Sequence, residues 1–252
     1  MPRYALLIEY DGAGFVGWQR QATGPSVQQA MEEAAASLAG GAVPEIIAAG
    51  RTDAGVHAEG QVAHLDLDRT LEPDRLAEAL NFHLGQARIA VRAAARVPDA
   101  FHARFSAKGR AYRYAILNRR ARPALASGRV WHVKHALDLD AMRDAARHLI
   151  GRHDFTSFRA AACQAASAVK TLDRLEILRE GETILVIAEA RSFLHHQVRN
   201  IVGTLKLVGE GRLSPDDMPR ILAARDRSAA GPTAPAEGLT LTAIRYDPDP
   251  FA

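Results

Sequence analysis

Cysteine and long apolar runs are what this sequence lacks most. It contains one cysteine, Cys163, which excludes an intramolecular disulfide and any multi-cysteine metal site. Apolar runs such as residues 184–188 are far too short to span a bilayer, and residues 1–3 lead into a strand pattern without a secretory signal. We therefore expect a cytoplasmic protein. Its 252 residues, 48% of them hydrophobic, suffice for one large domain or two halves.

Acidic residues are missing from a long central stretch. No Asp or Glu occurs between Asp99 and Asp138, although the net charge of the whole chain is only +3. The cations in this stretch are Arg104, Lys108, Arg110, Arg113, Arg119, Arg120, Arg122, Arg129 and Lys134. Interleaved with these cations are rings that include Phe101, His102, Phe105, Tyr112, Tyr114, Trp131 and His132. Cations interleaved with rings suit RNA, although each ring could equally pack in a core and the charge bias could be an accident of sequence.

The common cofactor motifs are also absent. The glycine-rich residues 11–14 lack the Gly-Lys-Ser/Thr of a nucleotide phosphate loop. A metal hydrolase could use His57, His64 or the pair His195 and His196 together with Asp53, yet the histidines do not follow a His-x-x-x-His or two-carboxylate spacing. We therefore expect neither a cofactor nor a metal.

The segment of residues 48–58 is the strongest candidate for chemistry. Two glycines, Gly50 and Gly55, bracket Arg51 and Asp53, and apolar strand patterns precede and follow them. Asp between glycines is commonly a turn residue that bonds its own backbone. Here Arg51 can also keep the carboxylate of Asp53 ionised, and an ionised, positioned carboxylate can act as a base or a nucleophile.

Periodicity predicts two α+β halves. In the first, strands are expected at residues 3–10, 45–49, 61–66 and 87–97, with Tyr4 and Tyr10 on one face of the first strand. Helices are expected at 26–38, with a capping box and an end at Gly40 and Gly41, and at 73–82. The loop of residues 15–19 is expected to expose its two aromatic residues.

The second half repeats the order of the first. Strands are expected at 110–117, 171–179, 184–191 and 239–246, and helices at 138–150, at 195–208 and after 214–217. The predicted fold is therefore α+β: two similar split-βαβ halves, ferredoxin- or RRM-like, forming a continuous, mainly antiparallel sheet with a central basic cleft. We place the N-terminal half at residues 1–105 and the C-terminal half at 106–252.

A series of motifs along the chain resembles the tRNA pseudouridine synthase A family. The motifs are residues 15–19 (FVGWQ), 50–58 (GRTDAGVHA), 101–105 (FHARF), 108–114 (KGRAYRY), 193–203 (FLHHQVRNIVG) and 231–239 (GPTAPAEGL). They follow the family's order, which makes the series far more specific than any one motif. Gln197 departs from the methionine expected in many relatives, beside the site rather than in its chemistry.

The resemblance implies a reaction and roles for individual residues. The family isomerises uridine to pseudouridine in the anticodon stem-loop of tRNA, at positions 38–40, without a cofactor. Asp53 matches the essential aspartate, acting as a nucleophile or as a base on a glycal route; the sequence leaves both open. Tyr112 matches the tyrosine that stacks on the extruded base. Arg199 matches the basic partner of the aspartate, and Arg51 would fill the vacated space or hold the phosphate.

The resemblance also implies partners. The residues expected to contact tRNA are Phe101, His102, Ala103, Arg104, Phe105, Arg120, Ala162, Cys163, Gln164, Ala165 and Ala166. A homodimer that shares one tRNA is expected. A non-catalytic RNA-binding module would share the basic stretch and the split-βαβ halves, but it would have no use for Arg51 and Asp53 in a glycine-bracketed turn.

Overall fold

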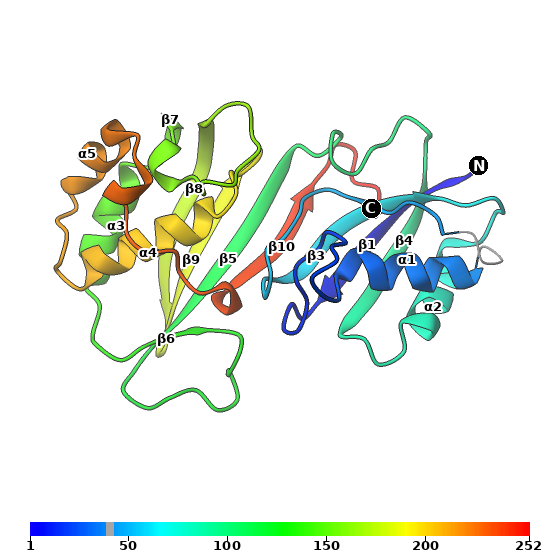
Figure 1. Cartoon of the computed structure of the whole chain (residues 1–252), viewed down its shortest axis with the longest axis horizontal. Helices are drawn as coiled ribbons and strands as arrows, with labels where there is room; N and C mark the ends of the chain where they lie inside the picture. The colour runs from blue at the N-terminus through cyan, green and yellow to red at the C-terminus, as the bar shows by residue number, and fades with distance from the viewer. Residues whose placement is uncertain (39–42) are drawn as a thin grey trace. The chain divides into compact units, whose positions relative to one another are not determined.

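The computed structural model describes residues 1–38 and 43–252. These residues divide into two units: unit 1 comprises Met1–Arg110 and Thr240–Ala252, and unit 2 comprises Ala111–Leu239. Each unit combines helices with mainly antiparallel strands, which confirms the predicted α+β class (Figure 1). Within the described ranges, every helix is too short or too polar to traverse a lipid bilayer.

Unit 1 is built around a hydrophobic central strand. Strand β1 (Arg3–Tyr10) pairs antiparallel with β3 (His57–Asp66) and with β4 (Ile89–Val97). The short β2 (Ile47–Ala48) pairs antiparallel with β3, and β10 (Leu239–Arg245) pairs with β3 in parallel. The predicted inward face of β1 is confirmed, because Tyr4 is fully buried and Tyr10 is only 4% exposed.

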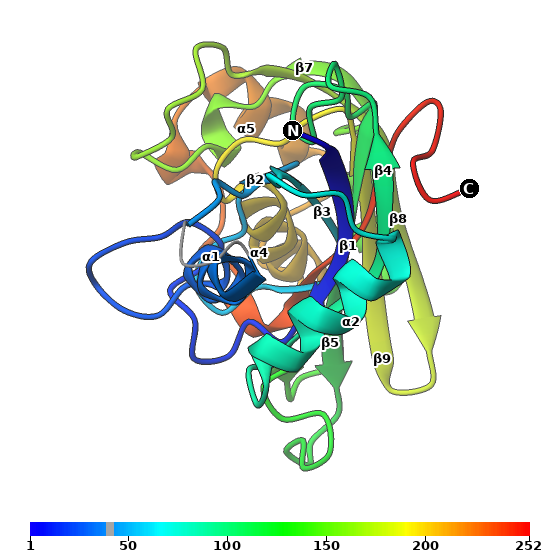
Figure 2. The same ribbon diagram turned by 90° about the vertical axis from the view of Figure 1, so that its right-hand side faces the viewer.

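Two helices cover unit 1. Helix α1 (Val27–Leu38) packs against α2 (Pro73–Leu84), and α2 contacts β4. Figures 1 and 2 show α1 lying against one face of the sheet. The order β-α-β-β-α-β predicted for the first half is therefore confirmed. The predicted helix end at Gly40 and Gly41 falls outside the described residues.

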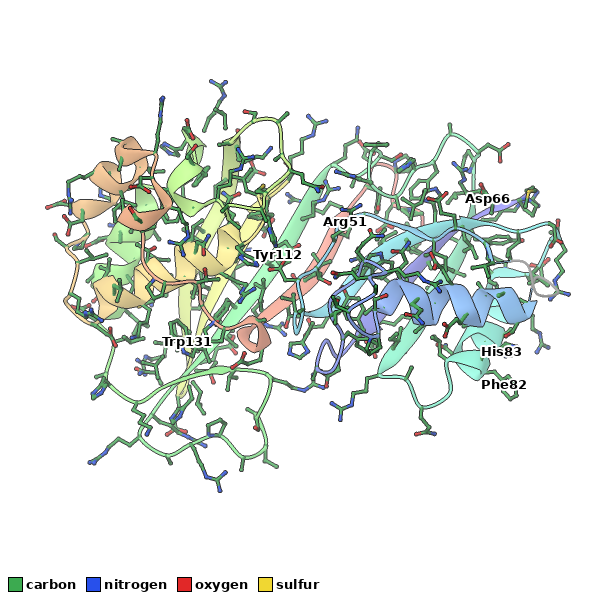
Figure 3. The ribbon with its side chains drawn as sticks, viewed as in Figure 1. Arg51, Asp66, Phe82, His83, Tyr112 and Trp131 are labelled. Atoms are coloured by element: carbon green, nitrogen blue, oxygen red, sulfur yellow. The ribbon has the colours of Figure 1, made fainter. Side chains whose placement is uncertain are left out.

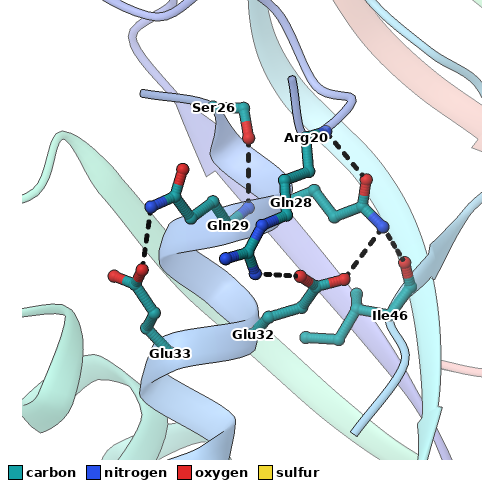
Figure 4. A network of polar contacts seen from close by, with 7 residues as sticks. All are labelled: Arg20, Ser26, Gln28, Gln29, Glu32, Glu33 and Ile46. Carbon is teal, nitrogen blue, oxygen red and sulfur yellow. Dashed lines mark hydrogen bonds and ion pairs between the residues drawn. The ribbon is translucent and has the colours of Figure 1, made fainter. Parts of the chain in front are cut away.

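A polar network fixes the start of α1. The hydroxyl of Ser26 accepts a hydrogen bond from the backbone N–H of Gln29 at 3.2 Å, which caps the helix, whereas the side chain of Gln29 bonds Glu33 instead of returning to Ser26. Gln28 donates to Glu32 at 2.9 Å and to the carbonyl of Ile46 at 3.3 Å (Figure 4). The network thus ties the helix to the segment that leads into β2.

Unit 2 contains most of the remaining strands. Its strands follow the order β5 (Gly109–Asn118), β9 (Thr183–Ala190), β8 (Val169–Glu180) and β7 (Gly151–Asp154), and β6 (Trp131–Val133) pairs with β5 in parallel. The pairs β8–β9 and β7–β8 are antiparallel. Helix α3 (Leu139–Arg147) packs on β8 and on α4 (Gln197–Gly209), and α5 (Asp217–Ala224) follows. Short 3-10 turns occur at Thr156–Phe158, Arg227–Ala229 and Ala236–Gly238.

The sequence prediction was wrong or incomplete at a few places. Trp18, expected to be exposed, is only 1% exposed and lies 6.0 Å from the ring of Tyr10. Strands β6 and β7 were not predicted. The helix expected at residues 138–150 ends at Arg147, because the chain turns at Gly151, whose φ of 97° favours glycine, to enter β7.

The N-cap of α1 gives a stability prediction. Replacing Ser26→Ala removes the acceptor for the Gln29 N–H, so the free energy of unfolding should fall by about 1 kcal/mol. Urea unfolding monitored by circular dichroism would measure this change. The control is Ser37→Ala, which removes an exposed hydroxyl from the last turn of the same helix and should change stability by less than about 0.5 kcal/mol. Equal losses in the two variants would contradict a capping role.

Candidate active site

Asp53 lies on the connection between β2 and β3 in unit 1. The backbone N–H of Ala49 bonds the carbonyl of Val62 at 2.7 Å, which holds the chain to β3 until it turns away. The turn closes where the N–H of Val56 bonds the carbonyl of Asp53 at 3.1 Å, and Gly55 has a φ of 77°. The side chain of Asp53 is half-buried. Its carboxyl group is therefore carried by a short, hydrogen-bonded turn with a glycine where the backbone is left-handed.

The loop of residues 12–18 clamps this turn through the backbone. The N–H of Trp18 bonds the carbonyl of Thr52 at 3.1 Å, and the N–H of Gly55 bonds the carbonyl of Phe15 at 3.3 Å. A Cβ at Gly17 would lie 2.6 Å from the carbonyl oxygen of Thr52, and one at Gly12 would lie 2.2 Å from that of Val56. Glycine is therefore required at both points of closest approach.

Side chains beneath the turn hold Thr52 from the other side. The hydroxyls of Tyr10 and Thr52 share a buried hydrogen bond of 2.7 Å. The amide of Gln61, which is fully buried, donates to the carbonyl of Gly50 at 2.8 Å and reaches the Tyr10 hydroxyl at 3.5 Å. Burial raises the pKa of Tyr10 to about 12, so this hydroxyl keeps its proton near neutral pH.

Arg51 lies on the same turn, directly before Thr52. Its side chain is exposed (Figure 3), and it forms no ion pair with any residue in the part of the chain that the structure describes. The described residues therefore show no ion pair between Arg51 and Asp53 that would keep the carboxylate ionised, as the sequence led us to expect. An exposed guanidinium beside the turn could instead meet an anionic ligand from solvent.

Strand β5 of unit 2 presents two tyrosines in different settings. Tyr114 is fully buried, its hydroxyl donates to the carbonyl of Pro235 at 2.8 Å, and burial raises its pKa. Tyr112 is half-buried (Figure 3), and its ring meets that of Phe193 edge to face at a centroid distance of 5.2 Å. Tyr114 is therefore a structural residue, whereas part of the Tyr112 side chain remains accessible.

Arg199 belongs to the first turn of α4 in unit 2 and is half-buried. Its Nε donates to the carbonyl of Ala234 at 2.8 Å, and its own carbonyl accepts from the N–H of Ala234 at 3.1 Å. Close packing keeps the two segments together, because a Cβ at Gly203 would lie only 1.7 Å from the carbonyl oxygen of Pro232. The link of residues 231–235 is thus held directly against α4.

Arg227, which joins this network, was not singled out from the sequence. The guanidinium of Arg227 donates to the carbonyl of Gly231 at 2.8 Å and to the side-chain oxygen of Asn200 at 3.0 Å. Thr233 donates to the same oxygen at 2.7 Å, while the amide nitrogen of Asn200 bonds the carbonyl of Phe158 at 2.9 Å. Arg227 lies outside the motifs of the sequence, so no sequence signal indicated it.

Gln197, the departure from the family pattern, is 1% exposed at the start of α4. Its side-chain oxygen accepts from the N–H of Leu194 at 2.8 Å, and its amide nitrogen is buried with no hydrogen-bond partner among the described residues. The residue therefore shapes the entry of the chain into α4. His196 precedes it with a left-handed φ of 62°.

The turn of residues 101–105 in unit 1 stacks its rings. The ring of His102 lies 4.3 Å from that of Phe105 and 4.8 Å from that of His64. Burial lowers the pKa of His64 to about 4, so its ring is neutral near pH 7, and its Nδ1 accepts the N–H of Ala103 at 3.2 Å. Arg104 is exposed and Phe105 is 73% exposed, so the outer face of the turn offers a cation and a ring.

The same turn is anchored from below. Phe101 packs against Tyr246 at 5.2 Å, and the hydroxyl of Tyr246 donates to the carbonyl of Ala103 at 2.7 Å. Arg110 bonds the carbonyl of Arg104 at 3.0 Å and that of Ala49 at 2.8 Å. Arg110 therefore joins this turn to the strand end that leads into the Asp53 turn.

The loop of residues 162–166 in unit 2 is tied to the start of α4. Arg159 donates to the carbonyls of Cys163 at 2.6 Å and Ala165 at 2.9 Å, and the N–H of His195 meets the sulfur of Cys163 at 3.4 Å. Burial raises the pKa of the Cys163 thiol, but N–H donation from Ala165 and His195 together with the hydrogen bond and charge of Arg159 outweighs this and leaves the pKa below its usual value. The side chains exposed to solvent are those of Ala162, Gln164 and Ala166. Arg120 is also exposed, after the end of β5.

Comparison with known proteins gives a consistent result. The model of a family described as tRNA pseudouridine synthase matches residues 6–106 and 145–247. A protein of Acidiphilium cryptum named tRNA pseudouridine synthase A is 63% identical over 252 residues, covering 100% of this chain and 99% of the relative. Proteins of the same name from Paramagnetospirillum magneticum and Rhodospirillum centenum are 60% and 59% identical, each over 98% of this chain and over 96% and 100% of the relatives.

The clamp on the Asp53 turn gives a second prediction. Gly17→Ala should lower the free energy of unfolding by about 1–2 kcal/mol for the left-handed backbone and by about 1–3 kcal/mol more for the clash with Thr52. Gly14→Ala is the matched control, since its φ is 87° but a Cβ there meets nothing within 4 Å. Urea unfolding of both variants isolates the clash. Equal losses would mean that the loop does not press on the turn.

Proposed function

This chain belongs to the tRNA pseudouridine synthase family, and from that premise we propose that it isomerises uridine in the anticodon stem-loop of tRNA with Asp53 as its catalytic carboxylate. The enzyme is an isomerase that converts uridine of tRNA to pseudouridine. The observation that supports Asp53 most directly is its setting: a turn fixed by backbone bonds to the loop of residues 12–18 and by Thr52. A carboxylate held in this way loses little entropy on meeting a substrate.

The reaction requires one positioned carboxylate. The C1′–N1 bond of uridine breaks, the uracil rotates, a C1′–C5 bond forms, and the proton lost from C5 is balanced by one gained at N1. Charge that develops at C1′ as the first bond breaks is stabilised by a carboxylate, which acts as nucleophile at C1′ or as base on the glycal route. Nothing is added to the substrate or removed from it.

Three further residues serve the same uridine in this proposal. Tyr112 stacks on the extruded base; its partial exposure and its rigid contact with Phe193 support that role. Arg199 pairs with the carboxylate, and the bond from its Nε to Ala234 sets its direction. Arg51 holds a phosphate or fills the space that the base leaves, which suits its exposed side chain without an ion pair among the described residues.

The remaining assignments follow the family. The turn of residues 101–105, Arg120 and the loop of residues 162–166 contact the tRNA, and the exposed Arg104 and Phe105 offer the charge and the ring that RNA recognition uses. The enzyme acts in the cytoplasm as a homodimer that shares one tRNA, and this part of the proposal rests on the family resemblance alone.

The catalytic proposal is tested by Asp53→Asn. Pseudouridine formation should fall by about 10⁴-fold or more, because the amide can neither attack C1′ nor accept a proton. Binding of tRNA, measured by filter retention, should stay within about threefold. Asp68→Asn, which neutralises an exposed carboxylate beyond β3, is the control and should leave both unchanged. Equal loss of binding and activity would favour a non-catalytic RNA-binding module, and full activity would remove Asp53 from the chemistry.

The RNA-contact proposal is tested by Arg104→Ala. The KM for tRNA should rise while kcat stays constant, and the slope of log affinity against log salt should shrink by about 1, as expected for the loss of one phosphate contact. Arg75→Ala is the matched control, because Arg75 is an exposed arginine of α2 that pairs with Glu78 at 3.1 Å. An unchanged salt slope in Arg104→Ala would show that this side chain does not meet the backbone of the RNA.

A further inference from the structure

The backbone on both sides of Asp53 is held to the protein at several points, but the bonds differ in kind. Backbone bonds from Trp18 and to Phe15 fix the outer side of the turn. The inner side depends on side chains: the hydroxyl of Tyr10 bonds that of Thr52 at 2.7 Å, and Gln61 bonds the carbonyl of Gly50 at 2.8 Å. Thr52 directly precedes Asp53, so its side chain sets where the following residue stands.

We propose that Tyr10 is a positioning residue for the isomerisation, acting through Thr52 to hold the carboxylate of Asp53 in its reactive place. This inference rests on the catalytic role proposed for Asp53. Tyr10 itself touches no reacting atom, because its ring is part of the buried face of β1 and only 4% of it is exposed.

The geometry indicates that the hydrogen bond between Tyr10 and Thr52 fixes the position of the turn. Tyr10 is the last residue of β1, and its backbone is fixed by pairing with β3 and β4. Its ring is confined by Trp18 at a centroid distance of 6.0 Å. The hydroxyl of Tyr10 therefore has a fixed position at the end of a paired strand. Thr52, which is 7% exposed, is positioned by Tyr10, and Tyr10 is not positioned by Thr52.

Gln61 extends the same support to the glycine that opens the turn. Its amide nitrogen lies within reach of both the carbonyl of Gly50 and the hydroxyl of Tyr10, at 2.8 and 3.5 Å. The residues on either side of Arg51 are thus held by groups that meet at the Tyr10 hydroxyl. The pKa of Tyr10, raised to about 12 by burial, keeps that hydroxyl neutral over the working range of pH.

Tyr10→Phe tests the inference. The variant keeps the ring in the core and removes the hydroxyl, and with it the bond to Thr52 and the longer contact with Gln61. The rate constant for pseudouridine formation in a single turnover should fall by about 10- to 100-fold, since displacing a reacting group by about 1 Å has effects of this size. The KM for tRNA should stay within about twofold, because no residue that meets RNA is altered.

The chain offers a matched control. Tyr4 lies on the same buried face of β1, and its hydroxyl bonds the backbone of Leu71 at 2.8 Å, away from the Asp53 turn. Tyr4→Phe therefore removes a comparable buried hydroxyl and should leave the rate constant within about twofold of the wild-type value. An equal fall in rate for Tyr4→Phe and Tyr10→Phe would overturn the inference, since activity would then follow general stability.

A second pair of variants keeps the test independent of folding. Thr52→Ser retains the hydroxyl and should preserve the rate, whereas Thr52→Val removes it at constant shape and should lower the rate as Tyr10→Phe does. The double variant Tyr10→Phe with Thr52→Val should be no slower than either single variant, because both act through one bond. Multiplicative losses in the double variant, or a normal rate in Tyr10→Phe, would overturn the inference. Activity in Asp53→Asn would instead refute the proposed function itself.

Discussion

The contact between the loop of residues 12–18 and the Asp53 turn is the constraint on which the rest of unit 1 depends. Two chains of backbone cannot come this close where either carries a Cβ, and the distances at Gly12 and Gly17 leave no room for one. The approach lets the N–H of Trp18 and the carbonyl of Phe15 bond the turn directly. The backbone that carries the carboxylate is therefore fixed on its outer side by main-chain bonds.

Unit 2 uses the same device around Arg199. The link of residues 231–235 crosses α4 where Gly203 has no side chain, and its backbone carbonyls then accept bonds from Arg199 and Arg227. The half-buried guanidinium is directed by a peptide carbonyl of a neighbouring segment. In both units, then, a glycine lets two backbone segments pass close together. Hydrogen bonds to the backbone at that point then position a residue with a charged side chain.

How far the sequence predicts this structure depends on the length of each pattern. Strand β1, helices α1, α2 and α4 and the β8–β9 hairpin carry enough periodic residues to be recognised, and their predicted positions are close to those observed. Strands β6 and β7 have three and four residues, too few for a period to show. Trp18 was misplaced because its glycine-rich neighbourhood indicates a loop, whereas the loop folds inward over Tyr10.

The sequence predicted which residues are candidates for the site, but it did not predict most of their contacts. The glycine bracket and the family motifs point to Asp53, Tyr112 and Arg199, whereas the strand pattern alone treats Tyr112 and Tyr114 alike. The structure distinguishes them by burial and partner. Tyr114 is buried and its hydroxyl donates to the carbonyl of Pro235, whereas Tyr112 is only half-buried. The bond between Tyr10 and Thr52 and the contact of Gln61 with Tyr10 could not be predicted from the sequence, because the paired residues lie 42 and 51 positions apart.

The motif series of this family therefore contains two kinds of residue. Asp53, Tyr112 and Arg199 bear the groups that the proposed chemistry needs. Gly17, Gly203 and Gly231 bear none, yet each lies where another segment passes at less than van der Waals distance from a hypothetical Cβ. Substituting these glycines would move the charged groups without touching them. The motif that contains Gly17, although far from Asp53 in the sequence, thus restricts where the Asp53 turn can lie, and Gly203 and Gly231 do the same for the segment that bonds Arg199.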